Sequence, residues 1–316
     1  MNGQNPLQND FILIVAGEDS GDIIGENAVR SAVRDGFSVF GTGGKKMQKA
    51  GLIPLANFED LAVNGFLDVL KKLPKLLWVM RKIITELKKK ECVKLVCIDY
   101  AGMNLRLLKI AKKIGKPVFY IAPPQIWAWK KSRGRFFKGV SVGVFFPFEE
   151  EIYKEFGASV VKLEHPALSN IKNAKPTFEF QNKTLFLTGS RLGQVKRNIN
   201  TYIKMALVAQ SKGETPLFVA SRPVLAEFLI KKLKNKFPVI VKPAIASFKG
   251  AKSVVATPGT AIFEAYIAGV PTEAVAVIDP LTYIMGKLFL KTKYLTLPNI
   301  LSGKEVVSER IIVKWI

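Results

Sequence analysis

Short apolar runs rich in valine, isoleucine and leucine alternate with amphipathic stretches along almost the whole chain. The first series predicts strands at 11–15, 37–40, 94–98, 117–121 and 142–146, and helices at about 22–34, 70–90 and 103–114. A second series begins after residue 180, with strands at 184–188, 216–220, 238–241, 253–256 and 274–278, and helices near 195–211, 223–236 and 261–268. This alternation is typical of parallel, doubly wound sheets. We therefore predict two similar α/β domains, joined by a hinge at 163–177.

The composition supports two packed domains and argues against several classes of protein. At 316 residues, 48% of them hydrophobic, the chain is long for one core and apolar enough for two. Its two cysteines, Cys92 and Cys97, and its one histidine, His165, predict no disulfide framework and no metal site. No signal peptide is evident, and no apolar run reaches the roughly 18 to 20 residues that span a bilayer. We expect a cytoplasmic or peripheral protein, with a structural hydrogen bond at His165.

The chain is strongly basic, with a formal net charge of +23 to which both halves contribute. A basic field attracts phosphorylated substrates, anionic lipid or nucleic acid, although a lysine-rich surface also simply keeps a protein in solution. Binding to nucleic acid is the least favoured of these interpretations, because it gives no purpose to the acidic turn and the phosphate-type turns described next.

Acidic side chains follow two of the first-half strands, at the strand ends where α/β proteins bind ligands. The stretch "VAGEDSGDIIG" (15–25) reads as a strand, a glycine turn and a helix, yet it carries Glu18, Asp19 and Asp22 where an anion would normally sit. Asp99 directly follows the run "KLVCI". Its position suits a general base in a cleft and equally suits the N-cap of the next helix.

Two glycine turns of the second half are suited to phosphate. They offer Gly189, Ser190 and Arg191 in "FLTGSRLGQV", and Gly259, Thr260 and Ala261 in "VVATPGTAIFEAYIAGVP". Arginine binds phosphate oxygens in a bidentate way, and free amides at a helix N-terminus are able to take a diphosphate. Glu264 lies about one turn inside the second helix, where it could accept hydrogen bonds from ribose hydroxyls. The alternatives are ordinary capped helices, with Glu264 only favourable to the helix dipole.

The stretch "VLKKLPKLLWVMRKIITELKKK" (69–90) predicts a basic amphipathic helix. Such a helix is able to lie on anionic lipid, or to pack its leucine stripe against a sheet as an ordinary crossover. A loop at 123–139 combines tryptophan and phenylalanine with lysine and arginine. That composition fits a membrane interface and also single-stranded nucleic acid.

Several stretches taken together resemble lipid-A-disaccharide synthase, a family of GT-B glycosyltransferases. They are "AGEDSGD" (16–22), "VFGTGGKKMQKAG" (39–51), "LAVNGFLDVL" (61–70), "CIDYAGMN" (97–104), "YIAPPQIWAWKKSR" (120–133), "FFPFEEEIY" (145–153), "TGSR" (188–191), "PGTAIFE" (258–264) and "LTLPNILSGKEVV" (295–307). These stretches cover nearly the whole chain, and the pair "APPQIWAW" and "LPNILSG" is the most specific.

The resemblance implies two GT-B domains facing a cleft. Residues 1–167 would form an acceptor-binding, membrane-facing domain, and residues 168–316 would form a UDP-sugar-binding domain. The implied reaction is a metal-independent, inverting transfer that needs no cofactor. It joins UDP-2,3-diacylglucosamine to 2,3-diacylglucosamine 1-phosphate through a β(1→6) bond and releases UDP. Because both substrates carry acyl chains, the enzyme would lie on the inner face of the cytoplasmic membrane, as a monomer or an oligomer, bound to its anionic surface.

The resemblance also implies roles for single residues, with Asp99 as the base. The implied UDP contacts are Gly189, Ser190, Arg191, Gly259, Thr260, Ala261, Glu264 and Asn299. Because carboxylates accept hydrogen bonds from sugar hydroxyls, the candidate acceptor-sugar residues are Glu18, Ser20, Gly21 and Asp22. The candidate membrane contacts are Phe66, Leu70, Leu73, Leu76, Leu77 and Trp78.

The chain also departs from the family pattern. The family usually has glycine at the position of Glu164 and serine at that of Pro258, and often has glutamate at that of Gln194. Ala276 and Val277 stand where it tends to have an aromatic and a basic residue. The sequence ends at Ile316, some tens of residues before the family does, so we expect an incomplete second domain. These departures leave open an alternative, a weakly active or inactive GT-B-like fragment that binds membrane or nucleotide.

Overall fold

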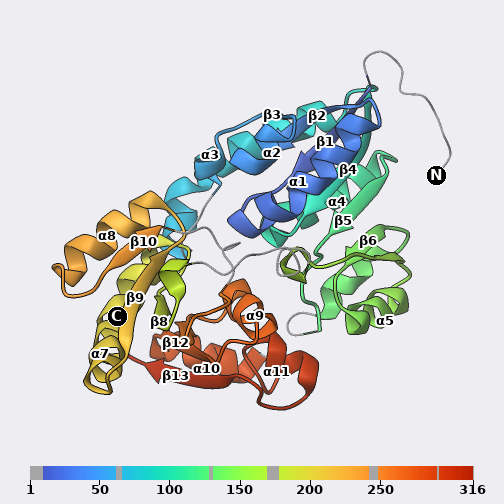
Figure 1. Cartoon of the computed structure of the whole chain (residues 1–316). Coiled ribbons are helices and arrows are strands. Elements are labelled where there is room, and N and C mark those ends of the chain that lie inside the picture. Colours follow the sequence, from blue (N-terminus) through green and yellow to red (C-terminus); the bar gives the residue numbers. More distant parts are fainter. Residues whose placement is uncertain are drawn as a thin grey trace. The chain divides into compact units, whose positions relative to one another are not determined.

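The structure, a computed structural model, describes residues 10–61, 66–127, 131–168, 178–241, 248–289 and 292–315. Of residues 59, 66–72, 285, 288 and 289 it describes the backbone alone. The chain divides into two compact units, Met1–Glu164 and His165–Ile316 (Figure 1). The sequence analysis put the boundary three residues later, after residue 167.

The first unit contains a parallel sheet of seven strands in the order β3-β2-β1-β4-β5-β6-β7. The strands are β1 (Phe11–Val15), β2 (Ser38–Thr42), β3 (Leu52–Pro54), β4 (Cys92–Ile98), β5 (Val118–Ile121), β6 (Ser141–Val144) and β7 (Ser159–Lys162). Chain order reverses between β1 and β4, so these two strands flank the topological switch point of the sheet.

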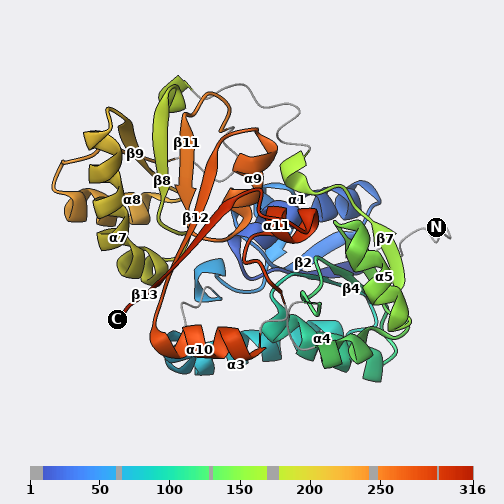
Figure 2. The same ribbon diagram turned by 90° about the horizontal axis from the view of Figure 1, so that it is seen from below.

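Helices pack on both faces of this sheet because successive residues of a strand point to opposite faces. Leu13 and Val15 point to the core shared with α3 (Phe66–Leu87) and α4 (Ala101–Lys113). Ile14 and Ala16 point to the core shared with α1 (Asp19–Arg34) and α2 (Lys45–Lys49). Helix α5 (Pro147–Glu155) lies between β6 and β7 in the chain. Figure 2 shows the chain turned by 90° from the view of Figure 1.

The second unit repeats this plan with six parallel strands in the order β10-β9-β8-β11-β12-β13. They are β8 (Lys183–Leu187), β9 (Thr215–Ala220), β10 (Val239–Val241), β11 (Ser253–Ala256), β12 (Thr272–Ile278) and β13 (Ser308–Val313). Helices α7 (Leu192–Ser211) and α8 (Pro223–Leu233) pack on one face, and α9 (Thr260–Ile267) packs on the other. Two further helices are α10 (Pro280–Phe289) and α11 (Leu297–Ser302). Here the switch point lies between β8 and β11.

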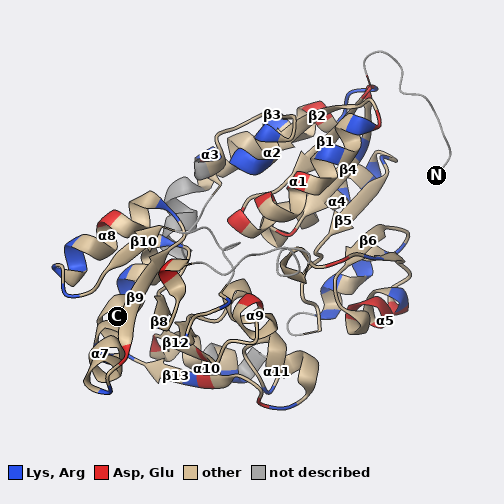
Figure 3. Cartoon of the chain, in the orientation of Figure 1, with Lys and Arg blue, Asp and Glu red and all other residues tan. Residues whose placement is uncertain are grey.

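The fold class predicted from the sequence, two doubly wound parallel α/β sheets, is confirmed. Each predicted strand and helix is present, most of them with shifted ends. The elements that the sequence analysis missed are mostly short or at sheet edges, namely β3, β7, β13, α2, α5, α10 and α11. Within the described residues, no helix combines the length and the apolar character that crossing a membrane requires. Lysine and arginine occur on helices of both units (Figure 3).

Candidate functional site

The switch point of the first unit brings Ser20 and Asp99 together. Strands β1 and β4 run side by side with Val15 opposite Cys97, so the turn after β1 lies next to the residue after β4. The Ser20 hydroxyl donates a hydrogen bond of 3.2 Å to Oδ2 of Asp99. Two predicted site residues that are 79 positions apart in the sequence therefore share a contact.

The backbone around Asp99 is left-handed, with φ of +48° at Asp99 and +44° at Tyr100. Such angles are costly for residues other than glycine, and they gather at functional sites. The N-cap of α4 is Tyr100, so the alternative that Asp99 caps this helix is wrong. The Tyr100 ring lies over Gly17, where a Cβ would come within 2.5 Å of it. Only glycine fits there, which explains one glycine of the acidic turn.

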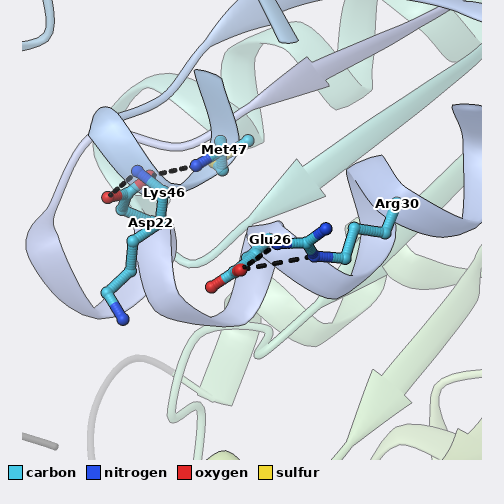
Figure 4. Close-up of polar contacts among 5 residues, drawn as sticks. All are labelled: Asp22, Glu26, Arg30, Lys46 and Met47. Carbon is cyan, nitrogen blue, oxygen red and sulfur yellow. Dashed lines mark hydrogen bonds and ion pairs between the residues drawn. The ribbon is translucent and has the colours of Figure 1, made fainter. Parts of the chain in front are cut away.

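Asp22 explains why one of the acidic side chains stands where an anion would normally sit. Its carboxylate accepts hydrogen bonds from the backbone amides of Lys46, at 3.2 Å, and Met47, at 3.0 Å (Figure 4). A side chain of α1 thus caps the neighbouring helix α2, in the manner that an external anion would. Asp22 is only 8% exposed, so its carboxylate has a structural role that the sequence analysis did not consider.

The other residues of this turn belong to the start of α1. Glu18 is the N-cap of the helix, Asp19 lies in its first turn, and Gly21 is buried. Acidic side chains at this end complement the positive end of the helix dipole. Glu18 and Ser20 are half-buried and therefore stay within reach of a ligand.

The switch point of the second unit brings the two predicted phosphate turns together. The turn after β8 contains Gly189, and the turn after β11 contains Thr257 and Gly259. Gln194 links them, because its Nε2 donates to the hydroxyl of Thr257 at 3.2 Å. Gly189 has a φ of +133°, and a Cβ there would lie 2.5 Å from Gln194 Oε1, so the turn requires glycine.

Helix α9 has no side-chain cap at its N-terminus, and it contains a buried acidic residue. Its N-cap is Gly259, which has no side chain to cap the helix, and Thr260 is exposed. Glu264 is the fifth residue of α9, beyond the first turn, so the interpretation as a dipole partner loses its basis. Burial raises the pKa of Glu264 to about 8. Its Oε2 atom is buried and has no hydrogen-bond partner among the described residues, an arrangement that a ligand hydroxyl would satisfy.

Arg222 is a residue that the sequence analysis missed. It follows β9 as the N-cap of α8, and its Nη2 donates to the carbonyl oxygen of Ser190 at 3.0 Å. It therefore supports the same turn in which Arg191 is the N-cap of α7. The sequence signal that could have identified Arg222 was its position two residues after an apolar strand, in "FVASRP".

Asn299, for which a UDP contact was predicted, has its side-chain amide engaged within the second unit. It is fully buried, and its Nδ2 donates to Val307 O at 2.7 Å and to Glu309 Oε1 at 2.8 Å. Its Oδ1 accepts from the amides of Val306 and Val307. With every polar atom of the amide engaged, the side chain joins α11 to β13, and α11 in turn packs against α9.

Helix α3 packs one side into the core and leaves apolar side chains exposed elsewhere, and whether these bind lipid stays a prediction. Val79, Ile83 and Leu87 are buried in the core, as a crossover helix requires. On the rest of the helix Trp78 is 51% exposed and Leu73 is 38% exposed. Leu76 and Leu77 are half-buried, whereas the side chains of Phe66 and Leu70 lie outside the described residues.

Two described aromatic side chains of the loop at 123–139 pack inside the first unit. Phe137 is fully buried, and Trp127 packs edge-on against Phe148 with ring centroids 5.1 Å apart. Trp129 lies outside the described residues. Trp127 and Phe137 therefore do not form the exposed stacking platform that single-stranded nucleic acid requires.

His165 has the structural hydrogen bond that we expected. Its Nδ1 accepts from the amide of Ala167 at 3.1 Å, and its ring packs edge-on against Phe263. Burial lowers the pKa of this imidazole to about 4. Among the described residues, no group of three or more histidine, cysteine or acidic side chains is arranged to hold a metal ion.

Comparison with known proteins gives consistent matches along the chain. The family model for lipid-A-disaccharide synthetase matches residues 12–314. The lipid-A-disaccharide synthase of Syntrophus aciditrophicus is 30% identical over 327 residues, which cover 96% of this chain and 85% of that protein. The enzyme of the same name from Aquifex aeolicus is 31% identical over 297 residues, covering 90% and 82%.

Solved structures show the fold at much lower identity. UDP-GlcNAc 2-epimerase from Neisseria meningitidis, bound to UDP-GlcNAc, superposes with a TM-score of 0.59. The match covers 94% of this chain and 88% of that one, at 12% identity. The likeness shows the two-domain GT-B-like fold alone.

Proposed function

Because the chain belongs to the lipid-A-disaccharide synthetase family and is a glycosyltransferase of lipid A synthesis, we propose that it joins UDP-2,3-diacylglucosamine to 2,3-diacylglucosamine 1-phosphate. The proposed bond is β(1→6), and UDP is the second product. The observation that carries the proposal is the placement of Asp99, held in a left-handed backbone at the switch point and bonded to Ser20.

The second unit is proposed to bind the UDP-sugar. The diphosphate would lie on the turns at 189–191 and 259–261, where Arg191 and the first amides of α9 supply positive charge. Glu264 would accept hydrogen bonds from the ribose hydroxyls, and this would satisfy its partnerless Oε2 atom. Arg222 would keep the first turn in shape through Ser190.

The first unit is proposed to bind the acceptor sugar beside Asp99. Glu18, Ser20 and Gly21 would shape this site, while Asp22 holds α2 in place. The Asp99 carboxylate would take the proton of the acceptor 6-hydroxyl as its oxygen attacks the anomeric carbon of the donor. The bond to UDP breaks on the opposite side, so the configuration inverts, and the charge passes to the diphosphate.

A membrane surface is the proposed location of the reaction, on the inner face of the cytoplasmic membrane. Leu73 and Trp78 present apolar surface beside lysines of the same helix, a combination that binds anionic lipid. The net charge of +23 acts in the same direction.

The test is turnover by the purified protein with both acylated substrates in detergent or vesicles, measured as disaccharide and UDP. Asp99→Asn is expected to lower kcat by about 10²–10⁴-fold while UDP still binds, because only the base is lost. Full turnover in this variant would reject Asp99 as the base. UDP binding without product in the unaltered protein would favour the alternative of an inactive nucleotide-binding protein, to which Pro258 also points, because proline removes an amide donor beside the diphosphate turn.

A further inference from the structure

The backbone conformation of Asp99 requires an explanation beyond Asp99 itself. Two consecutive residues, Asp99 and Tyr100, have left-handed φ angles although neither is glycine. Backbone of this kind persists only where surrounding contacts outweigh its cost. The groups that supply those contacts decide where the Asp99 carboxylate lies.

Two buried side chains donate to the same carbonyl group, that of Asp99. The hydroxyl of Tyr120 lies 2.7 Å from this oxygen, and Nδ2 of Asn104 lies 2.9 Å from it. Both residues are fully buried. Tyr120 belongs to β5, where it pairs with Cys97 of β4, and Asn104 lies in α4 just after the left-handed pair.

Asn104 also reaches across the switch point. Its Nδ2 lies 3.2 Å from the carbonyl oxygen of Val15 and 3.2 Å from that of Ile98. The end of β1, which leads to Ser20, and the end of β4, which leads to Asp99, are thereby held by one amide group. The amide of Asp99 donates to Ile121 O at 3.0 Å, so both polar groups of its peptide backbone are engaged.

We propose that Tyr120 and Asn104 are positioning residues, which hold the Asp99 backbone left-handed and so aim its carboxylate at the acceptor hydroxyl. The inference rests on the proposed function, because it takes Asp99 as the base. Neither side chain would touch substrate, because both are fully buried. Without the two donors the backbone is free to relax toward the right-handed region, which would move the carboxylate away from Ser20.

The chain offers a matched control in Tyr153. Tyr120 and Tyr153 are both fully buried, and each packs edge-on against Phe137, with ring centroids at 5.5 Å and 4.9 Å. Each hydroxyl donates to a backbone carbonyl, that of Asp99 for Tyr120 and that of Pro124 for Tyr153. Replacing either tyrosine by phenylalanine removes one buried hydroxyl from the same core.

The experiment compares Tyr120→Phe with Tyr153→Phe by steady-state kinetics and thermal unfolding. We expect similar losses of Tm, but a decrease in kcat of about 10- to 100-fold for Tyr120→Phe alone, because small displacements of a reacting group are costly. The KM for the UDP-sugar and the affinity for UDP should stay unchanged. Equal kcat values for the two variants would overturn the proposal.

A second measurement separates this inference from the proposed function. In the Asp99→Asn background, Tyr120→Phe should cause no further loss of the residual turnover, because a positioning residue acts only through its target. A further loss of the same size would overturn the inference. Full activity of Asp99→Asn alone would instead overturn the proposed function. Asn104→Asp, which removes the amide donors, should repeat the kcat effect of Tyr120→Phe in protein that folds.

Discussion

The hydroxyl of Ser20 donates a hydrogen bond of 3.2 Å to Oδ2 of Asp99, across the point where the strand order of the first sheet reverses. Ser20 comes from the first turn of α1 and Asp99 from the end of β4. This contact joins the acidic turn to the proposed base, so the two features of the sequence belong to one site.

Ser20→Ala is expected to lower kcat by about 10-fold, because the carboxylate of Asp99 loses the hydrogen bond that fixes its orientation. UDP affinity, which in the proposed function depends on the other unit, should not change. Steady-state kinetics and calorimetric titration with UDP measure the two effects. Ser31→Ala on the same helix is the control, and a kcat equal to that of this control would contradict the prediction.

Glu264 makes the stability of the protein depend on pH. Its carboxyl has a pKa near 4.5 when unfolded and of about 8 in the folded chain, so the folded state binds more protons between these values. Stability therefore falls as the pH rises from about 4.5 to about 8. Glu264→Gln should remove this slope and be more stable than the unaltered protein at pH 8, by up to a few kcal/mol. Urea unfolding across this pH range measures it.

Exposed Glu227 of α8 provides the matched control, since Glu227→Gln should leave the slope in place. An unchanged slope in Glu264→Gln would show that other groups cause it. Hydrogen bonds from the ribose hydroxyls, as proposed for Glu264, would favour its charged carboxylate, so UDP should also bind Glu264→Gln more weakly than the unaltered protein.

Arg222→Ala is expected to weaken UDP binding by about 10-fold, because the Ser190 carbonyl loses its partner and the turn proposed to hold the diphosphate loosens. Uridine, which lacks the diphosphate, should lose much less affinity. Titration of both ligands distinguishes the two cases. An equal loss for UDP and uridine would place Arg222 elsewhere in the nucleotide site.

Asp22→Ala should destabilise the first unit by about 1–3 kcal/mol, because the part-buried amide of Lys46 and the buried amide of Met47 lose their acceptor. Chemical unfolding measures this loss. Asp22→Asn keeps one acceptor oxygen and should recover part of the stability. If Asp22→Ala instead raised the KM for the acceptor at unchanged stability, Asp22 would be a sugar contact after all.

We expect a Leu73→Ser, Trp78→Ser double variant to bind lipid less well, because it removes two exposed apolar side chains of α3. Sedimentation with vesicles of phosphatidylglycerol and phosphatidylethanolamine measures the bound fraction, and the melting temperature should change little. Val79→Ser is the contrasting variant, because Val79 is fully buried and its loss should lower stability. Undiminished binding by the double variant would place the lipid contact on another surface.

Much of the fold was predictable because it depends on local periodicity. Apolar runs such as 11–15 and 253–256 became β1 and β11 with the same bounds. The short edge elements escaped prediction because few residues carry their pattern: β3 and α2 contain 3 and 5 residues. Strand β13 leaves Ile311 and Val313 exposed, so it does not need the continuous apolar run by which the central strands were recognised in the sequence.

By itself, the amino-acid sequence determined the two doubly wound sheets, the glycine turns and the acid that follows β4. Only the tertiary structure decided what those acids and amides do. Asp22 caps a helix through an amide 24 residues away, and the side-chain amide of Asn299 makes all its hydrogen bonds within its own unit. The hydroxyl of Tyr120 donates to the carbonyl oxygen of Asp99 from the neighbouring strand. The physical reason is that periodicity and turn chemistry act between near neighbours, whereas a buried polar group takes whichever partner the packed chain brings to it.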